Sequence, residues 1–246
     1  MSVHKDLIDL GNDSFTHYGE VFSFLQKIED GSIDVLITDP PYPLGGELNL
    51  NFCGSTKYSD GEHYKQLSEF DLDLFIKKAH GKMKENSALF VMTNRSNRSF
   101  FEKSIRDAGF TIKNELIWVK LQGFDEGFAM GANYLNAVEY IIYAHKGVLG
   151  KVNSKMNVFV KNSPNRGRNS KPEELYAHIL EPMNRLFEYP LVVDPFGGSD
   201  PLSRAKMRGL IHSMKTISNI LITGDETDPA EHGKLLKSQN LSKWIN

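Results

Sequence analysis

The sequence has little cysteine, no long apolar run and no excess charge of one sign, and each shortage excludes a class of protein. Cys53 is its one cysteine, so no disulfide can form within the chain, and a reducing cytoplasm fits. No apolar run approaches the roughly 20 residues that a membrane-spanning helix needs. Residues 1–13 lack the apolar core of a signal peptide, so we expect neither export nor a membrane partner.

The balance of charge and the absence of the common nucleotide-binding motifs limit the possible functions further. The chain has 29 basic and 31 acidic residues, so a nucleic-acid partner would have to bind a local basic face. Neither GxGxxG nor GxxxxGK[ST] occurs. His178 and His212 do not have metal-ligand spacing, so we expect no metal site. We also find no internal repeat and no low-complexity linker.

Apolar segments of strand type and helix type alternate along the chain. Strands are predicted at 33–38, 88–92, 112–120, 137–144, 191–193 and 219–223. Helices are predicted at 18–29, 70–84, 99–108, 172–188, 200–208 and after Pro229, with a long loop at 43–68 and a polar segment at 147–171. This alternation predicts an α/β fold with a parallel sheet, in which ligands bind beyond the carboxyl ends of the strands.

The stretch VLITDPPY ends one predicted strand with residues suited to holding an amine. The Asp39 carboxylate can accept a hydrogen bond from an amino group. The carbonyl of Pro40, which precedes Pro41, is a second and rigidly aimed acceptor. Tyr42 offers a ring on which a planar base can stack, a contact worth about 1–3 kcal/mol. The two acceptors match the two hydrogens of an exocyclic amine.

The stretch LVVDPFGGSD ends a second predicted strand. Glycines between a strand and a helix let the backbone approach a ligand closely. Downstream, Glu226 follows another apolar segment, where an acid can accept hydrogen bonds from both hydroxyls of a ribose. Either feature alone is best explained as a tight turn or a solvated loop acid. Together they indicate a nucleoside-type cofactor.

These stretches resemble the S-adenosylmethionine-dependent DNA amino-methyltransferases in the permuted arrangement called the β class. TDPPY is similar to the catalytic motif of that family, and VVDPFGGSD to its cofactor loop. SKPEELYAHIL is similar to the helix-opening motif before that loop, and WVK and AVEYIIYAHK are similar to the strands between the two halves. The resemblance runs from about residue 15 to residue 230.

The resemblance implies an α/β, Rossmann-like methyltransferase fold that is circularly permuted, with a mostly parallel sheet and helices on both faces. It implies one methyltransferase domain over residues 1–246, in a bacterial or phage-encoded cytoplasmic protein. Within that domain we expect a catalytic half at about 15–146, a basic loop at 147–171 and a cofactor half at about 172–246.

The resemblance also implies roles for individual residues. Tyr42 would stack on a base flipped out of double-stranded DNA, while Asp39 and the Pro40 carbonyl hold its amine. S-adenosylmethionine would provide the methyl group. The cofactor-binding residues implied by the resemblance are Asp194, Phe196, Gly197, Gly198, Lys171, Glu226 and Glu20, with Lys171 near the cofactor's carboxylate and Glu226 on its ribose.

Three positions depart from the family pattern. Asp200 stands where the family usually has glycine, and it could either repel the cofactor's carboxylate or cap the helix that begins at Pro201; the cap is the better interpretation. Glu20 stands where an aspartate often contacts the adenine of the cofactor, and it could instead stabilise a helix N-terminus. The segment before Glu226 is longer than usual in the family.

Basic residues near the predicted sheet edge are candidates for DNA contact. Four charges lie in the string 161–171, and others follow the first two strands. Such charges position a duplex without identifying its sequence, and for any one of them a solvated surface role is an equal alternative. The residues predicted to bind nucleic acid are Lys57, Arg95, Arg98, Arg166 and Arg168.

Adenine N6 is the predicted target, because the cytosine-N4 enzymes often have serine in place of Asp39. A cytosine-N4 methyltransferase and a catalytically degenerate nucleic-acid-binding protein are the alternatives. The chain has no large insertion to serve as a target-recognition domain, which favours a short target sequence or help from a second copy or a partner subunit.

Overall fold

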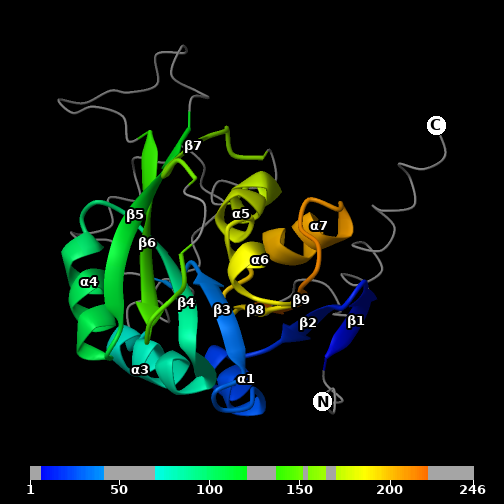
Figure 1. Ribbon diagram of the computed structural model, residues 1–246, viewed down its shortest axis with the longest axis horizontal. Helices are drawn as coiled ribbons and strands as arrows, with labels where there is room; N and C mark the ends of the chain where they lie inside the picture. Colours follow the sequence, from blue (N-terminus) through cyan, green and yellow to red (C-terminus); the bar gives the residue numbers. More distant parts are fainter. Residues whose placement is uncertain (1–6, 42–69, 121–136, 152–154, 165–169, 221–246) are drawn as a thin grey trace, which may run out of the picture.

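The computed structural model describes residues 7–41, 70–120, 137–151, 155–164 and 170–220 (Figure 1). Its strands are β1 (Ile8–Gly11), β2 (Ser14–Tyr18), β3 (Ile33–Thr38), β4 (Met83–Thr93), β5 (Thr111–Val119), β6 (Val138–Lys146), β7 (Val158–Val160), β8 (Leu191–Asp194) and β9 (Lys215–Ile220). Its helices are α1 (Val21–Lys27), α3 (Leu72–Lys82), α4 (Arg98–Asp107), α5 (Glu173–Leu180), α6 (Met183–Leu186) and α7 (Pro201–Met207).

The nine strands form one mixed sheet in the order β1-β2-β9-β8-β3-β4-β6-β5-β7. The five central strands from β2 to β4 are mutually parallel, whereas β6 runs antiparallel to both β4 and β5. The carboxyl ends of β3, β4, β5 and β8 therefore share one edge of the sheet with the start of β6. The prediction of a mostly parallel sheet with helices on both faces is confirmed.

The order of the strands reverses between β3 and β8. From β3 the chain continues outward to β4, and from β8 it continues outward to β9 on the other side. The helix after β3, α3, packs with α1 and α4 on one face, while the helix after β8, α7, packs with α5 and α6 on the other (Figure 1). Open α/β sheets bind their ligands at such a switch point, beyond the carboxyl ends of the two strands.

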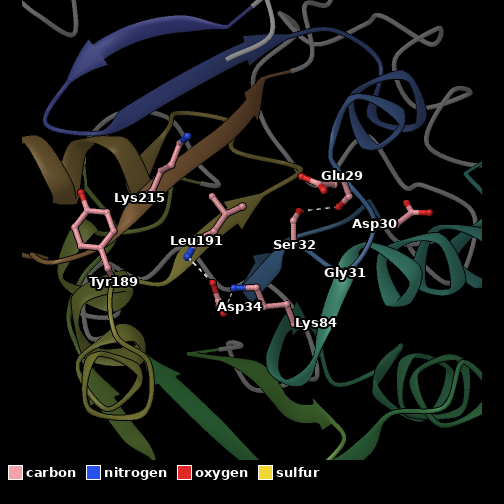
Figure 2. Close-up of a pocket in the computed structure, with 9 residues that line it drawn as sticks. All are labelled: Glu29, Asp30, Gly31, Ser32, Asp34, Lys84, Tyr189, Leu191 and Lys215. Carbon is pink, nitrogen blue, oxygen red and sulfur yellow. Dashed lines mark hydrogen bonds and ion pairs between the residues drawn. The ribbon is translucent and has the colours of Figure 1, made fainter. Parts of the chain in front are cut away.

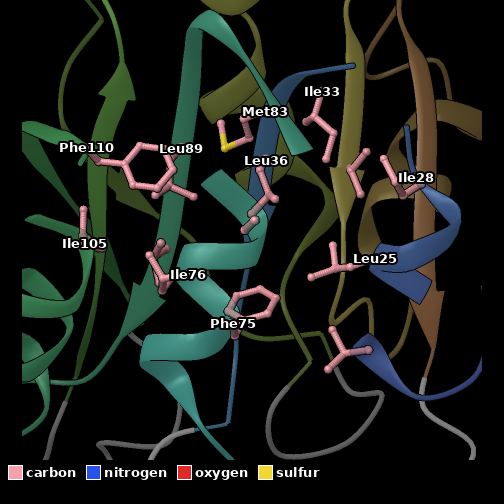
Figure 3. Close-up of a cluster of buried hydrophobic side chains, with 14 of the residues drawn as sticks. Leu25, Ile28, Ile33, Leu36, Phe75, Ile76, Met83, Leu89, Ile105 and Phe110 are labelled. Carbon is pink, nitrogen blue, oxygen red and sulfur yellow. The ribbon is translucent and has the colours of Figure 1, made fainter. Parts of the chain in front are cut away.

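The two covered faces of the sheet explain why the middle of β3 is continuously apolar. Leu36 points into the core beneath α1 and α3, where it lies among Leu25, Phe75 and Leu89 (Figure 3). Its neighbours Val35 and Ile37 belong to the opposite core, beneath α5 and α7, and all three are fully buried. A strand covered on both faces has no polar side to alternate with, so it reads as an unbroken apolar run.

Several element predictions differ from the structure. Strands β1 and β2 were not predicted, and β9 lies at 215–220 rather than at 219–223. The buried side chains of β2 and β9 are largely polar and form hydrogen bonds with one another. Thr216 donates to the hydroxyl of Ser14 at 3.0 Å, and His17 pairs with Asn219 at 2.7 Å. A buried polar seam of this kind has the sequence pattern of a surface loop.

Other boundaries differ for local reasons. The helix predicted over 172–188 is two helices, because Pro182 stands at the start of α6 and cannot continue α5. β4 begins directly after α3, five residues earlier than predicted. The three-residue strand β7 lies inside the segment predicted to be a polar loop. The long loop at 43–68 and the helix after Pro229 lie outside the described residues. No helix within the described ranges is long and apolar enough to cross a membrane.

Candidate active site

The two strand ends singled out in the sequence are neighbours in the structure. β3 and β8 pair directly, with Leu36 opposite Val193. Asp39 follows β3 by one residue, and Asp194 is the last residue of β8. Adjacent strands lie about 4.8 Å apart, so the two carboxyl-bearing tips face the same space beyond the switch point.

At the first tip, Asp39 is positioned by its neighbours in sequence and by one distant lysine. The side chain of Asp39 is about one-quarter exposed, and Pro40 behind it is buried. The Lys171 ammonium group donates to Asp39 Oδ2 at 2.6 Å. Pro41 begins the departure from the strand, and Tyr42 lies outside the described residues. Asp39 and Pro40 thus lie at the strand end where the sequence predicts them, and their role in holding an amine stays a prediction.

At the second tip, Asp194 is fully buried and organises the turn that follows. Its carboxylate accepts from the Tyr176 hydroxyl at 2.9 Å and from the Phe196 backbone N–H at 3.0 Å. Burial raises the pKa of Asp194 to about 7, and the nearby Asp200 and Asp39 carboxylates add to the rise, against the lowering by the two hydrogen bonds. The Asp39 carboxylate therefore lies close enough to contribute to the raised pKa of Asp194.

The glycines of the second tip are required by space and by backbone conformation. The N–H of Gly197 donates to the Asn219 carbonyl at 2.8 Å, which brings the turn against β9. A Cβ atom at position 197 would lie 3.2 Å from that carbonyl oxygen and 3.3 Å from Ser218 Cβ. Gly198 has a φ of 51°, in the left-handed region. No described residue lies within 4 Å of where a Cβ would stand on Gly198, which leaves the backbone open on the described side to close approach by a ligand.

Phe196 closes the turn on its other side. Its ring makes edge contacts with Phe70 and Phe75 of the α3 region, at centroid distances of 5.4 and 5.2 Å. The predicted cofactor loop is therefore held from both faces of the sheet, by Tyr176 on α5 and by the aromatic rings at α3.

Asp200 caps a helix, as the preferred interpretation of the sequence expects. Its side chain is fully buried, accepts from the Ser203 N–H at 3.2 Å at the start of α7, and accepts from the Thr16 hydroxyl at 2.9 Å. The carboxylate points into the α7–β2 contact, so it is committed to the protein's own donors.

Asp200 gives a stability prediction. Replacing it with alanine removes two buried hydrogen bonds and places alanine at a φ of 54°, so we expect the free energy of unfolding to fall by about 2–3 kcal/mol in urea denaturation. The control Asp200→Asn keeps an acceptor and tolerates the left-handed backbone, so its loss should stay below about 1 kcal/mol. Full stability of the alanine variant, together with tighter S-adenosylmethionine binding, would contradict the capping role.

Glu20 also caps a helix. Its two carboxylate oxygens accept from the N–H groups of Phe22 and Ser23, at 2.9 and 2.8 Å, at the start of α1. The residue is exposed at the carboxyl end of β2, on the ligand-binding edge. Its cofactor contact stays a prediction, as does that of Glu226, which lies outside the described residues.

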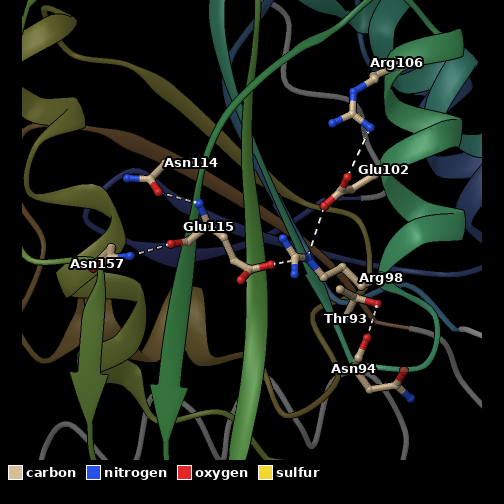
Figure 4. Close-up of polar contacts among 8 residues, drawn as sticks. All are labelled: Thr93, Asn94, Arg98, Glu102, Arg106, Asn114, Glu115 and Asn157. Atoms are coloured by element: carbon tan, nitrogen blue, oxygen red, sulfur yellow. Dashed lines mark hydrogen bonds and ion pairs between the residues drawn. The ribbon is translucent and has the colours of Figure 1, made fainter.

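The two arginines after β4 differ in their surroundings. Arg95 is exposed in the turn beyond Thr93. Arg98, at the start of α4, forms ion pairs with Glu102 at 3.1 Å and with Glu115 of β5 at 2.5 Å, as Figure 4 shows. Burial raises the pKa of Glu115 against the attraction of Arg98. Arg98 thus pairs with a partly buried acid, whereas Arg95 is exposed, and contact of either arginine with DNA stays a prediction. Lys57, Arg166 and Arg168 lie outside the described residues.

One cluster of charged residues at this edge was not predicted from the sequence. Lys171 contacts Glu139 at 3.1 Å as well as Asp39, and Lys120 contacts the same Glu139 at 2.7 Å. Both ammonium groups lie over the ring of Trp118, at 5.9 and 5.2 Å from its centroid. The strings WVK and AVEYIIYAHK indicated only strands, and the pairing of β5 with β6 is what brings their polar residues to Asp39.

A hollow at the opposite edge of the sheet is not part of this site. Figure 2 shows it beside the starting ends of β3, β8 and β9, where Asp34 accepts from the Leu191 N–H and pairs with Lys84. It is lined by Glu29, Asp30, Gly31, Ser32, Asp34, Lys84, Tyr189, Leu191 and Lys215. Within the described ranges, no group of three or more His, Cys, Asp or Glu residues could hold a metal ion.

Comparison with known proteins decides which family this geometry represents. The model of the N6_N4_Mtase family, described as DNA methylase, matches residues 33–166, a span that runs from the start of β3 into the predicted basic loop. The chain belongs to this family.

Individual relatives are more distant. The DNA adenine methyltransferase YhdJ of Escherichia coli (strain K12) is 30% identical over 110 residues, which cover 44% of this chain and 34% of YhdJ. The type II methyltransferase M.HpaI of Haemophilus parainfluenzae is 22% identical over 209 residues, which cover 73% of this chain and 62% of M.HpaI. The chain thus spans less than two thirds of the length of either relative.

Solved structures share the fold over nearly the whole chain. The M1.HpyAVI–SAM complex superposes with a TM-score of 0.63 at 17% identity and covers 93% of this chain and 98% of that one. The PvuII DNA methyltransferase, which is cytosine-N4-specific, has a TM-score of 0.59 at 16% identity and covers 93% of each chain. The fold is the α/β, Rossmann-like methyltransferase fold.

Proposed function

We propose that this DNA methylase transfers a methyl group from S-adenosylmethionine to the N6 amine of an adenine flipped out of double-stranded DNA. The observation that carries the proposal is the adjacency of two strand ends, Asp39-Pro40 directly after β3 and Asp194–Gly198 at the end of β8, at the switch point of the sheet. One tip has acceptors for an amine, and the other has a backbone turn open to a ligand. A methyl group could pass between them over a short distance.

The two acceptors at the first tip position the target amine. Asp39 and the Pro40 carbonyl each take one hydrogen of the amine, which favours a more tetrahedral nitrogen with its lone pair directed at the methyl group. Tyr42 stacks on the flipped base and holds its plane. A base still inside the duplex would not reach this edge, so flipping is required.

The second tip fits the cofactor on three observations. A side chain at Gly197 would crowd β9, Gly198 leaves its backbone exposed to approach, and Asp194 and Phe196 hold the turn between the two layers of helices. When bound, S-adenosylmethionine supplies a methyl group activated by its sulfonium. Glu20 and Glu226 are the acids proposed to meet its adenine and its ribose.

Adenine is favoured over cytosine by two observations. The first residue of the catalytic motif is Asp39, where cytosine-N4 enzymes often have serine, and the relative YhdJ is named a DNA adenine methyltransferase. The PvuII enzyme keeps cytosine N4 as the second candidate. The degenerate alternative rested on Asp200 and on the longer segment before Glu226; the capping bonds of Asp200 count against the first ground, and Glu226 lies outside the described residues.

The proposal is tested with the purified chain, labelled S-adenosylmethionine and DNA from a methylation-free host. Digestion of the DNA to nucleosides should yield labelled N6-methyl-2′-deoxyadenosine. Labelled N4-methylcytosine would overturn the choice of base but keep the enzyme class. No labelled nucleoside, with calorimetry that also detects no cofactor binding at millimolar concentration, would overturn the methyltransferase activity.

A further inference from the structure

Lys171 joins the predicted catalytic acid to a second acid on another strand. Its ammonium group lies 2.6 Å from Asp39 Oδ2 and 3.1 Å from Glu139 Oε2. The lysine side chain is 7% exposed, while the two acids are 25% and 21% exposed. A nearly buried cation therefore bridges two carboxylates at the mouth of the proposed active site. Screening by water is weaker for a pair of this kind than for ion pairs on the surface.

The bridge divides the two oxygens of Asp39 between two tasks. Lys171 donates to Oδ2 of Asp39. Among the described residues, no other hydrogen bond or ion pair involves this carboxylate, so Oδ1 is the oxygen that can accept from an incoming amine. A single ion pair would leave the lysine free to follow Asp39 as it rotates. With Glu139 on its other side, the ammonium group is held from two directions, and the rotation of Asp39 is restricted.

Glu139 is itself firmly placed. It lies at the start of β6, paired in register with Trp118 of β5, and it also accepts from Lys120 at 2.7 Å. Trp118 is 1% exposed, and its indole N–H donates to the Lys161 carbonyl at 2.6 Å, so its ring is a fixed floor beneath both lysines. Burial alone would raise the pKa of Glu139, but Lys171 and Lys120 hold it below its ordinary value, so the acid is charged at neutral pH.

We propose that Glu139 is a positioning residue for methyl transfer, which acts through Lys171 to hold the Asp39 carboxylate with one oxygen aimed at the target amine. The inference rests on the proposed function and adds a residue to its machinery. It differs from the role implied by the family resemblance, in which Lys171 serves the cofactor's carboxylate. The two roles predict different kinetic changes when the lysine is removed.

The test is a double-mutant cycle of Glu139→Gln and Lys171→Met, measured as kcat under saturating DNA and cofactor, with S-adenosylmethionine binding followed by calorimetry. Small displacements of a positioning group cost about tenfold or more in rate, so each single variant should lower kcat by about tenfold. The double variant should be no slower than Lys171→Met alone, because Glu139 has no effect once the lysine is gone. The cofactor dissociation constant should stay within about twofold of wild type in all three.

Lys84→Met is the matched control. It also removes a lysine from an ion pair with a partly buried acid, Asp34, but at the opposite edge of the sheet, so its kcat should equal that of wild type. Unchanged cofactor binding shows that each variant is folded.

Three outcomes would overturn the inference. They are a Glu139→Gln variant with wild-type kcat, multiplicative losses of about a hundredfold in the double variant, and a Lys171→Met variant that loses cofactor affinity while keeping kcat. The last would return Lys171 to the cofactor. A wild-type protein that methylates no DNA overturns the proposed function instead, whereas an active wild type with any of these three results overturns the role of Glu139 alone.

Discussion

Replacement of Asp39 by alanine is expected to lower kcat for DNA methylation by at least about a thousandfold, with S-adenosylmethionine bound as in wild type. The amine would lose its charged acceptor at the moment when positive charge develops on the nitrogen, and preorganised groups of this kind contribute about 10²–10³-fold each. The loss of Asp39 also removes one of the two acids that hold Lys171, whose ammonium group would then pair with Glu139 alone, beside the site proposed for the amine.

Two measurements make this result specific. Single-turnover methylation of DNA gives the rate, and calorimetry with S-adenosylmethionine tests whether the cofactor turn beside β8 is intact. The variant Asp39→Asn is the matched control: it keeps one acceptor oxygen and the same shape but loses the charge, so its rate should fall between those of wild type and alanine. Wild-type rates in the alanine variant would end the assignment of Asp39 as the catalytic residue.

The central strands were predictable because their physics is local. Residues 35–37 and 191–193 are apolar throughout, as is typical of strands buried on both faces, and an Asp-Pro pair follows closely on each. Proline lacks the N–H that continues a sheet, so the end of each strand could be placed to within a residue. That these ends meet followed from the parallel sheet implied by strands alternating with helices.

Strands β2 and β9 could not be predicted accurately, because the burial of their polar side chains depends on partners far away in the sequence. β9 carries Thr216, Ser218 and Asn219, all buried, and its interior is satisfied by hydrogen bonds to β2 and to the turn at Pro195. In a sequence, polar residues of this kind usually indicate an exposed segment. The strand was therefore predicted on the apolar residues that follow them, and its predicted start is four positions too late. Only the partner strand, some 200 residues earlier, reveals why these side chains can be buried.

The same limit applies to the site. Asp39, Asp194 and the two glycines lie in short motifs whose chemistry can be read locally. Glu139 and Lys120 are single charged residues in the predicted strands. Their contact depends on the register of β5 and β6, which pairs Trp118 with Glu139, and no local sequence pattern encodes that register. Lys171 could be predicted as a functional residue from its motif, but its contact with Asp39 joins positions 132 residues apart.

The second large effect is expected from Asp194, as a dependence of stability on pH. Burial, with smaller contributions from Asp200 and Asp39, raises its pKa to about 7 from an ordinary value of 3.8. The folded protein therefore holds the proton over a range in which the unfolded chain has released it. The resulting stabilisation is fully present below about pH 4 and is lost as the pH rises through about 7, a change on the order of 4 kcal/mol.

The measurement compares wild type with Asp194→Asn, which keeps the shape but cannot ionise. The difference between their free energies of unfolding, taken from urea curves between pH 4 and pH 8, should shift against the wild type as the pH rises. Tyr176→Phe removes a hydrogen bond that favours the ionised acid, so its loss of stability should extend to higher pH. A difference between wild type and Asp194→Asn that is constant with pH would show that Asp194 is ionised throughout, and with it that the acid is not desolvated.

The same ionisation should appear in cofactor binding. Under the proposed function, Asp194 lies near the methionine part of S-adenosylmethionine, whose ammonium and sulfonium groups favour an ionised neighbour. Binding should therefore release a proton near neutral pH and tighten by up to about tenfold for each pH unit as the pH rises from 6 to 7. Calorimetry in buffers of different ionisation enthalpy measures that proton directly. Asp194→Asn should bind more weakly and without pH dependence. A wild-type affinity that does not change between pH 6 and pH 8 would place the positive groups of the cofactor away from β8, because a buried acid with this pKa must respond to a cation beside it.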